Sequence, residues 1–411
     1  MSIKIDNPAS PHRRHALATM VSLVAAASAT PVLLAACGGG GDTPAAGGGA
    51  TPQSFTTGRI SGLGSIIVNG VRFDDNGAHV EDDEDGTSHT SRELKLGMMV
   101  EVEASSINDV AATAVASVIR FGSEMVGPVS AVDATGQTLT LLGQTVEIRP
   151  ETVFDPTISG GLAGISVGQV LEIHALFNAT SGHYIATRVE REDGAAVYKL
   201  RGLVSAPNTT DKTFQIGTAV INYGGVAADQ LPANLANGVR VRVRLQTQLN
   251  ASGQWVAIRV RSGVRRVDDI GDARIIGLVT DFTSPQQFSV QGVPINATNA
   301  TFEPNAAAVR KDALVAVRGT ASNGTIIATR VRVVDALADD DWRLIELHGS
   351  VGELSAGPKT FMLREVLVDY SQVLRWKDGV PADLVNGRNV EVKGVWSADR
   401  SKLLAGIIEF E

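Results

Sequence analysis

Residues 237–245 read NGVRVRVRL, and in this stretch branched apolar residues alternate strictly with arginine. Alternation with a period of two is typical of a β-strand that buries one face, because successive side chains point to opposite sides of the strand. A turn-forming Asn-Gly pair opens the stretch, and a further strand-like segment, VAIRVRS, follows at 256–262. The stretch is therefore predicted to be a half-buried strand followed by a second one.

The same turn followed by an alternating strand occurs five times in the chain. The other copies read LGMMVEVEA from Leu96, VGQVLEIHA from Val167, KDALVAVRG from Lys311 and NGRNVEVKG from Asn386. Three more landmarks recur in a fixed order: an opening Gly-x-Val strand, a strand-turn-strand segment such as VNGVRF, and a closing strand such as IATRVRVV. The opening glycines, at 58, 127, 202, 277 and 349, are 69 to 75 residues apart, which predicts five copies of one unit.

Each unit provides about five strands, with a longer loop or short helix between the third and the fourth, for example at 297–311. This order and length resemble a small closed barrel of the oligonucleotide/oligosaccharide-binding (OB) type, and a small open sandwich is the alternative. A closed barrel has no free edge strands, so tandem copies are not expected to pair with each other. Scarce aromatic residues and abundant Val, Ile, Thr and Gly also favour an all-β fold.

The N-terminal segment has the three parts of a bacterial lipoprotein signal. Arg13 and Arg14 supply positive charge, residues 17–34 are mostly apolar, and Leu-Ala-Ala precedes Cys37, the only cysteine of the chain. The thiol of Cys37 is predicted to carry a diacylglycerol and to become the first residue of the mature protein. A membrane-spanning helix is the alternative, but the segment contains Pro31 and no basic flank follows it.

The residue after Cys37 indicates the membrane to which the lipoprotein is sorted. Gly38 rather than Asp follows the cysteine, which resembles the outer-membrane address of such lipoproteins more than the inner-membrane one. The arginine pair leaves export by the general or the twin-arginine route open. The predicted organisation is a signal peptide (1–36), the acylated cysteine with a Gly/Ala/Pro tether (37–57), and copies one to five of the β repeat (58–121, 122–194, 195–263, 264–337 and 338–411).

Charge is distributed unevenly along the chain. The full chain carries −8 and the signal carries +2, so the mature chain carries −10, which argues against a nucleic-acid partner. Copy three is the exception, with eight basic residues against two acidic ones. Its two long strands carry five arginines that an antiparallel hairpin would gather on one face, and we call them the arginine hairpin: Arg240, Arg242, Arg244, Arg259 and Arg261.

The guanidinium fork suits carboxylate or phosphate, so the arginine hairpin predicts an anion-binding surface for an acidic glycan, a lipid headgroup or an acidic protein partner. Replacing Arg240, Arg242 and Arg244 with Ser should then abolish retention on an anionic polysaccharide. The alternative is that these are ordinary charged outward positions, neutralised by the acidic copies one and two. The sequence favours this alternative.

Residues 81–86, EDDEDG, form an acidic loop that could hold Ca²⁺ through Glu81, Asp83 and Asp85. An EF-hand alignment fails, because Arg92 falls where a bidentate Glu is needed. The alternative is a solvated loop between two strands, and no other cofactor is predicted. His79 and His89 bracket the loop, but the histidines of the mature chain show no metal-ligand spacing.

Residues 164–168, GISVG, match the G-x-S-x-G pattern of hydrolase nucleophiles. That motif needs a helix after the serine, whereas an alternating strand follows here, so a turn is predicted instead.

The whole pattern, a lipoprotein signal followed by tandem units such as GLGSIIVNGVRFD at 62–74, resembles an uncharacterised bacterial family known only as a domain of unknown function. The resemblance covers nearly all of 57–411 and implies a β fold in a secreted or lipid-anchored protein, with no catalytic residues. We therefore predict a lipid-anchored binding or scaffold protein of the cell envelope, not an enzyme. The alternatives are an envelope enzyme, or a metal-dependent accessory subunit, with a site near the acidic loop.

Overall fold

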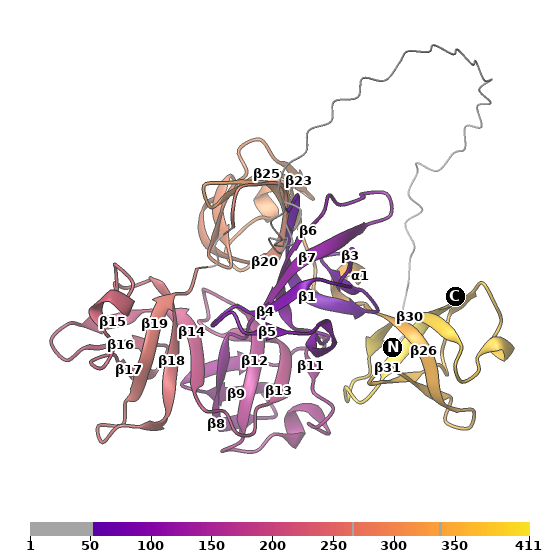
Figure 1. Cartoon of the computed structure of the whole chain (residues 1–411), viewed down its shortest axis with the longest axis horizontal. Helices are drawn as coiled ribbons and strands as arrows, with labels where there is room; N and C mark the ends of the chain where they lie inside the picture. Colours follow the sequence, from indigo (N-terminus) through magenta and orange to yellow (C-terminus); the bar gives the residue numbers. More distant parts are fainter. Residues whose placement is uncertain (1–51, 265–266, 337–338) are drawn as a thin grey trace, which may run out of the picture. The chain divides into compact units, whose positions relative to one another are not determined.

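The computed structural model describes residues 52–264, 267–336 and 339–411, and its strands form five successive groups, coloured from indigo for copy one to yellow for copy five (Figure 1). The predicted signal peptide, the predicted lipidation site Cys37 and residues 38–51 of the tether lie outside the described residues. None of the helices among the described residues is long and apolar enough to cross a membrane.

Copy one shows the unit in full. Its strands are β1 (Ser54–Leu63), β2 (Ile66–Val68), β3 (Val71–Asp74), β4 (His79–Asp82), β5 (Ser88–His89), β6 (Met99–Ala104) and β7 (Thr113–Phe121). β1 pairs with β2, β2 with β3, β3 with β7 in parallel, β7 with β6, and β6 again with β1. The circuit is closed, so the copy is a five-stranded barrel and the sandwich alternative is wrong.

The other four copies repeat this order of strands. Copy two contains β8 (Met125–Asp133), β9 (Thr138–Leu141), β10 (Gln144–Glu147), β11 (Val153–Phe154), β12 (Val170–Phe177) and β13 (Tyr184–Arg191). Copy three contains β14 (Tyr198–Leu203), β15 (Ser205–Asn208), β16 (Thr213–Ile216), β17 (Ala219–Asn222), β18 (Arg240–Leu249) and β19 (Trp255–Ser262). Copy four contains β20 (Ile270–Ser284), β21 (Gln287–Val290), β22 (Val293–Asn296), β23 (Thr301–Glu303), β24 (Leu314–Ser322) and β25 (Thr325–Val333). Copy five contains β26 (Ile345–Ser355), β27 (Thr360–Leu363), β28 (Val366–Asp369), β29 (Arg375–Lys377), β30 (Asn389–Trp396) and β31 (Leu403–Phe410).

All five barrels close in the same way, through a parallel pair between the third and the last strand of the circuit. This is the predicted OB-like order. The expected alternation is also confirmed: on β18, Val241, Val243 and Leu245 are buried in the core, whereas Arg242 and Arg244 point outward and are only partly covered.

In each copy, the connection between the third and the fourth strand of the five-stranded circuit contains a 3₁₀ turn. These turns are η1 (Ser91–Glu93), η2 (Gly161–Gly164), η3 (Ala228–Gln230), η4 (Ala306–Ala308) and η5 (Pro381–Asp383). The predicted loop or short helix at 297–311 is thus β23 followed by η4. A four-residue helix, α1 (Asp340–Arg343), lies between copies four and five.

The expectation that the copies do not pair with each other is wrong. Ser54–Thr57 of β1 pair in parallel with β20 of copy four, Gly62 and Leu63 pair with β26 of copy five, and β8 pairs with β14. The opening strand β1 is longer than its barrel needs, so each end offers backbone groups that its own neighbours leave unpaired. The same pairing extends the fold into residues 54–57, so the predicted tether boundary at residue 57 is too late.

Candidate functional site

The arginine hairpin forms as an antiparallel pair of strands. β18 and β19 place Arg242 opposite Arg261 and Arg244 opposite Arg259. The guanidinium groups of Arg242, Arg244 and Arg261 reach the acidic loop of copy one, which is more than 150 residues away in the chain. Nη1 of Arg242 donates to the backbone oxygen of Asp83 at 2.5 Å, and Nη1 of Arg261 donates to the backbone oxygen of Glu84 at 3.3 Å.

The centre of this contact is a buried ion network between copies one, two and three. Arg201 donates to Asp83 at 2.6 Å and to Glu124 at 3.3 Å, and Arg240 donates to the second oxygen of Glu124 at 2.8 Å. Burial by itself lowers the pKa of Arg201, but the negative charges of Asp83 and Glu124 outweigh it and raise the pKa above its usual value. A free anion would have to compete with these internal carboxylates.

The acidic loop does not gather its carboxylates around one point. Glu81 accepts a hydrogen bond from Nε of Arg120 at 2.6 Å, Asp83 bonds Arg201, and Asp85 accepts from the hydroxyl of Thr87 at 2.6 Å. The three predicted Ca²⁺ ligands are therefore directed at three different donors.

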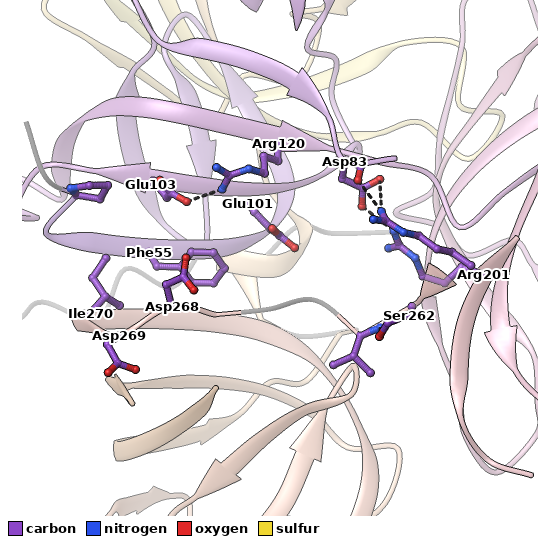
Figure 2. A pocket seen from close by; sticks show the side chains of 14 residues that line it. Phe55, Asp83, Glu101, Glu103, Arg120, Arg201, Ser262, Asp268, Asp269 and Ile270 are labelled. Carbon is purple, nitrogen blue, oxygen red and sulfur yellow. Dashed lines mark hydrogen bonds and ion pairs between the residues drawn. The ribbon is translucent and has the colours of Figure 1, made fainter. Parts of the chain in front are cut away.

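A cavity of about 530 Å³ lies beside this network, lined by residues of copies one, three and four. Figure 2 shows Arg120 directed at Glu103 and Arg201 directed at Asp83 within it. The third lining arginine, Arg242, lies 3.5 Å from Glu84. Each arginine that lines the cavity thus already contacts a carboxylate. We therefore assign no ligand to this cavity.

A second cavity, of about 370 Å³, is a more apolar groove between copies one, two and five. We call it the apolar groove. Its apolar lining includes Leu96, Phe154, Ile158, Met362, Leu367 and Trp396. Small-molecule sites in proteins are usually mostly apolar concavities of this size with a few polar groups that orient the ligand.

The polar groups of the apolar groove are not all satisfied. Arg188 donates to the backbone oxygen of Leu96 at 3.0 Å, and Nη2 of Arg400 donates to the backbone oxygen of Arg149 at 3.0 Å. Nε of Arg400 and Nε1 of Trp396 are buried with no hydrogen-bond partner among the described residues. Burial lowers the pKa of Arg400, against the opposing charge of Glu151. The groove therefore combines an apolar lining with two donors that lack an acceptor.

A third cluster, around His348 on β26, was missed by the sequence analysis. Ligand atoms of Glu346, His348 and Glu391 lie within 4.8 Å of one another, the geometry of a metal-binding set, and within the described residues they alone meet that criterion. Two cations already balance the carboxylates, because Arg72 of β3 bonds Glu346 and Lys393 lies 2.7 Å from it. We therefore describe it as an ion-pair network between copies one and five.

The pKa values in this network follow from its contacts. Burial alone would raise the pKa of Glu346, but hydrogen bonds from His348 and Lys393 outweigh it and lower the pKa to about 2. Burial alone would lower the pKa of His348, but hydrogen bonds to Glu346 and Glu411 outweigh it and raise the pKa. Glu346 and His348 lie two residues apart on β26, but Glu391 comes from β30 and Arg72 from β3 of copy one, so no single stretch of sequence carries the whole cluster.

The G-x-S-x-G segment lies in the turn predicted for it. Ser166 is exposed between η2 and β12, and its backbone N–H donates to the side chain of Gln169 at 2.9 Å. The strand β12 follows, rather than the helix that a nucleophile elbow requires.

The comparison with known families agrees with the repeated barrel. The model of the domain of unknown function DUF5666 matches residues 57–116, 126–190, 276–332 and 348–409. The chain belongs to this family. The four DUF5666 matches fall on copies one, two, four and five. Copy three, which carries the arginine hairpin, is outside them but closes the same strand circuit.

Comparisons with individual proteins add little. Drosophila Unr CSD456, a solved structure, is similar at 13% sequence identity over 41% of this chain and 78% of that chain, with a TM-score of 0.15. No curated protein matches this chain.

Proposed function

We propose that this protein is a lipid-anchored, multi-barrel binding protein of the cell envelope and that the apolar groove is its ligand site. The observation that carries the ligand site is the pair of buried donors, Trp396 Nε1 and Arg400 Nε, which have no acceptor among the described residues of a mostly apolar groove. Buried polar groups are almost always hydrogen-bonded, so an acceptor from outside the chain is a direct way to satisfy these two.

The ligand chemistry follows from the lining. Phe154, Met362 and Leu367 favour an apolar body, and the guanidinium of Arg400, 5.6 Å from the Phe154 ring, favours a carboxylate or another anionic acceptor at one end. We therefore propose a small amphipathic molecule with an apolar body and one acidic group. An anionic glycan or protein partner at the arginine hairpin stays a prediction, and the internal acceptors of Arg240 and Arg242 argue against it.

The envelope location rests on the sequence before and at Cys37. A cysteine carrying two or more acyl chains anchors a protein stably in a bilayer, whereas a single chain does so only marginally. Labelling cells with radioactive palmitate tests the anchor: the protein should carry label, and Cys37→Ser should abolish it. An unlabelled wild-type protein would contradict the anchor without affecting the groove.

The groove can be tested with anilinonaphthalene sulfonate, a fluorescent probe with an apolar body and one anionic group. Leu367 lines the groove and is 36% exposed, whereas Leu374 of the same copy is 58% exposed and does not line it. Placing a carboxylate in the groove with Leu367→Asp should weaken probe binding about tenfold, because it removes apolar contact and repels the sulfonate. Leu374→Asp is the matched control and should bind as wild type does. Equal binding by both variants would rule out the groove as the site.

An enzymatic role, or a metal-dependent accessory role at the acidic loop, was the alternative prediction. The divergent contacts of Glu81, Asp83 and Asp85 give that role no support.

A further inference from the structure

Arg59 on β1 is a buried cation whose side chain forms no hydrogen bond with the described residues. Its side chain is covered by copy four and α1, and the residue is only 3% exposed. None of its three guanidinium nitrogens has a hydrogen-bond partner among the described residues. Its guanidinium carbon lies 4.5 Å from the centre of the Trp342 ring. That contact stabilises the cation but supplies no acceptor.

Trp342 presents a second unsatisfied donor at the same place. It is 4% exposed, and its Nε1 is also buried without a partner among the described residues. Arg59 and Trp342 line one small cavity, together with Ser61, Asn69 and Arg332. All five side chains can donate a hydrogen bond, and those of Ser61 and Asn69 can also accept one. Ser61 already donates to the backbone oxygen of Ile67 and Arg332 to Asp339, whereas the two most deeply buried donors, Arg59 and Trp342, lack an acceptor among the described residues.

The fold does not require a cation at this position. The residue after the opening glycine is Pro128, Leu203, Leu278 and Ser350 in the other copies, and only copy one has arginine. Burying a charge without hydrogen-bonded partners is costly, so an arginine at this position calls for a compensating group. Burial lowers the pKa of Arg59 to about 10, against the charge of Glu151, so the guanidinium remains charged at neutral pH.

The size of the cavity limits what that group can be. Its volume is about 40 Å³. A single water needs roughly 10–15 Å³ of space, so the cavity has room for a group of a few heavy atoms. A carboxylate or a small inorganic oxyanion is a group of this kind.

We propose that the cavity beside Arg59 binds a small oxyanion, with the Arg59 guanidinium and the Trp342 indole N–H as its principal donors. The anion is inorganic phosphate or sulfate, or the carboxylate of a small organic acid. The site is separate from the apolar groove and does not depend on the proposed function.

The test is binding of radiolabelled phosphate to the full protein by equilibrium dialysis, with sulfate, acetate and chloride as competitors at constant ionic strength. Wild type should bind one phosphate per chain, displaced by sulfate and not by chloride. If acetate displaces phosphate at a lower concentration than sulfate does, the site prefers a carboxylate to an inorganic oxyanion. No saturable binding of phosphate, together with no rise of the thermal unfolding midpoint in acetate, would overturn the proposal.

Two variants make the result specific to the site. Arg59→Leu uses the residue that copies three and four carry at this position and should abolish binding. Arg330→Leu removes an exposed arginine of β25, paired with Glu303 at 2.7 Å, and should bind as wild type does. In parallel, phosphate should raise the thermal unfolding midpoint of wild type and Arg330→Leu but not that of Arg59→Leu. An equal rise in all three proteins would show that Arg59 is not the ligand-binding group.

Discussion

Replacing Asp83 with Asn should strongly destabilise the junction between copies one and three. Asp83 and Arg201 are 12% and 4% exposed and 2.6 Å apart, so they form a buried ion pair. Removing one partner of such a pair typically costs about 3–5 kcal/mol, because the other charge stays buried without compensation. Arg201 keeps its 3.3 Å contact with Glu124, so we expect the lower end of this range, about 3 kcal/mol.

The matched control is Asp85→Asn in the same acidic loop. Asp85 lies 3.3 Å from Arg244, but both side chains are partly exposed. Exposed pairs contribute only about 0–1 kcal/mol, so this variant should unfold nearly as wild type does.

The assay is urea unfolding followed by tryptophan fluorescence. Trp255, the one tryptophan of copy three, lies with its ring centre 5.7 Å from that of Tyr198 and reports on this barrel. A double-mutant cycle of Asp83→Asn with Arg201→Met isolates the pair, and its coupling should be at least about 1.5 kcal/mol. A coupling near zero, or equal losses for Asp83→Asn and Asp85→Asn, would refute the reasoning.

Two further predictions concern other parts of the fold. Because the pKa of His348 is raised above 6.5, its protonation stabilises the folded protein fully below that pH, and the stabilisation is lost as the pH rises through the folded pKa. His348→Gln should therefore lower the unfolding midpoint at about pH 5 but hardly at about pH 9, and an equal effect at both would contradict this. At the opening glycine of copy three, a Cβ on Gly202 would overlap the side chain of Ile216, whereas one on Gly225 would meet nothing within 4 Å. Gly202→Ala should thus lower stability by about 1–3 kcal/mol in urea unfolding and Gly225→Ala should not, and equal stability would disprove this packing role for the opening glycine.

Local sequence pattern was enough to predict the repeat and its strands, with a closed barrel favoured and an open sandwich left as the alternative. The alternation on β18 and the four ordered landmarks specify strands and turns, and these depend on neighbouring residues. What the pattern could not show is how the copies contact each other. Pairing of β1 with β20 and β26 depends on backbone groups that any sequence carries, so no residue type signals it.

The candidate sites illustrate the same limit. The arginine hairpin and the acidic loop were both recognised, but their contact joins segments more than 150 residues apart. The apolar groove takes its lining from three copies, so no single stretch has the composition of a site. Arg59 was overlooked because a single arginine in a strand normally points to solvent, and its burial is evident only from the packing of copy four and α1.

The most direct test of the central claim is native mass spectrometry of the protein purified from cell envelopes without denaturant. The account predicts one small amphipathic molecule per chain, retained by Leu374→Asp and clearly depleted in Leu367→Asp. Wild-type protein without any bound molecule, or one that Leu367→Asp retains equally well, would contradict the assignment of the apolar groove as the ligand site.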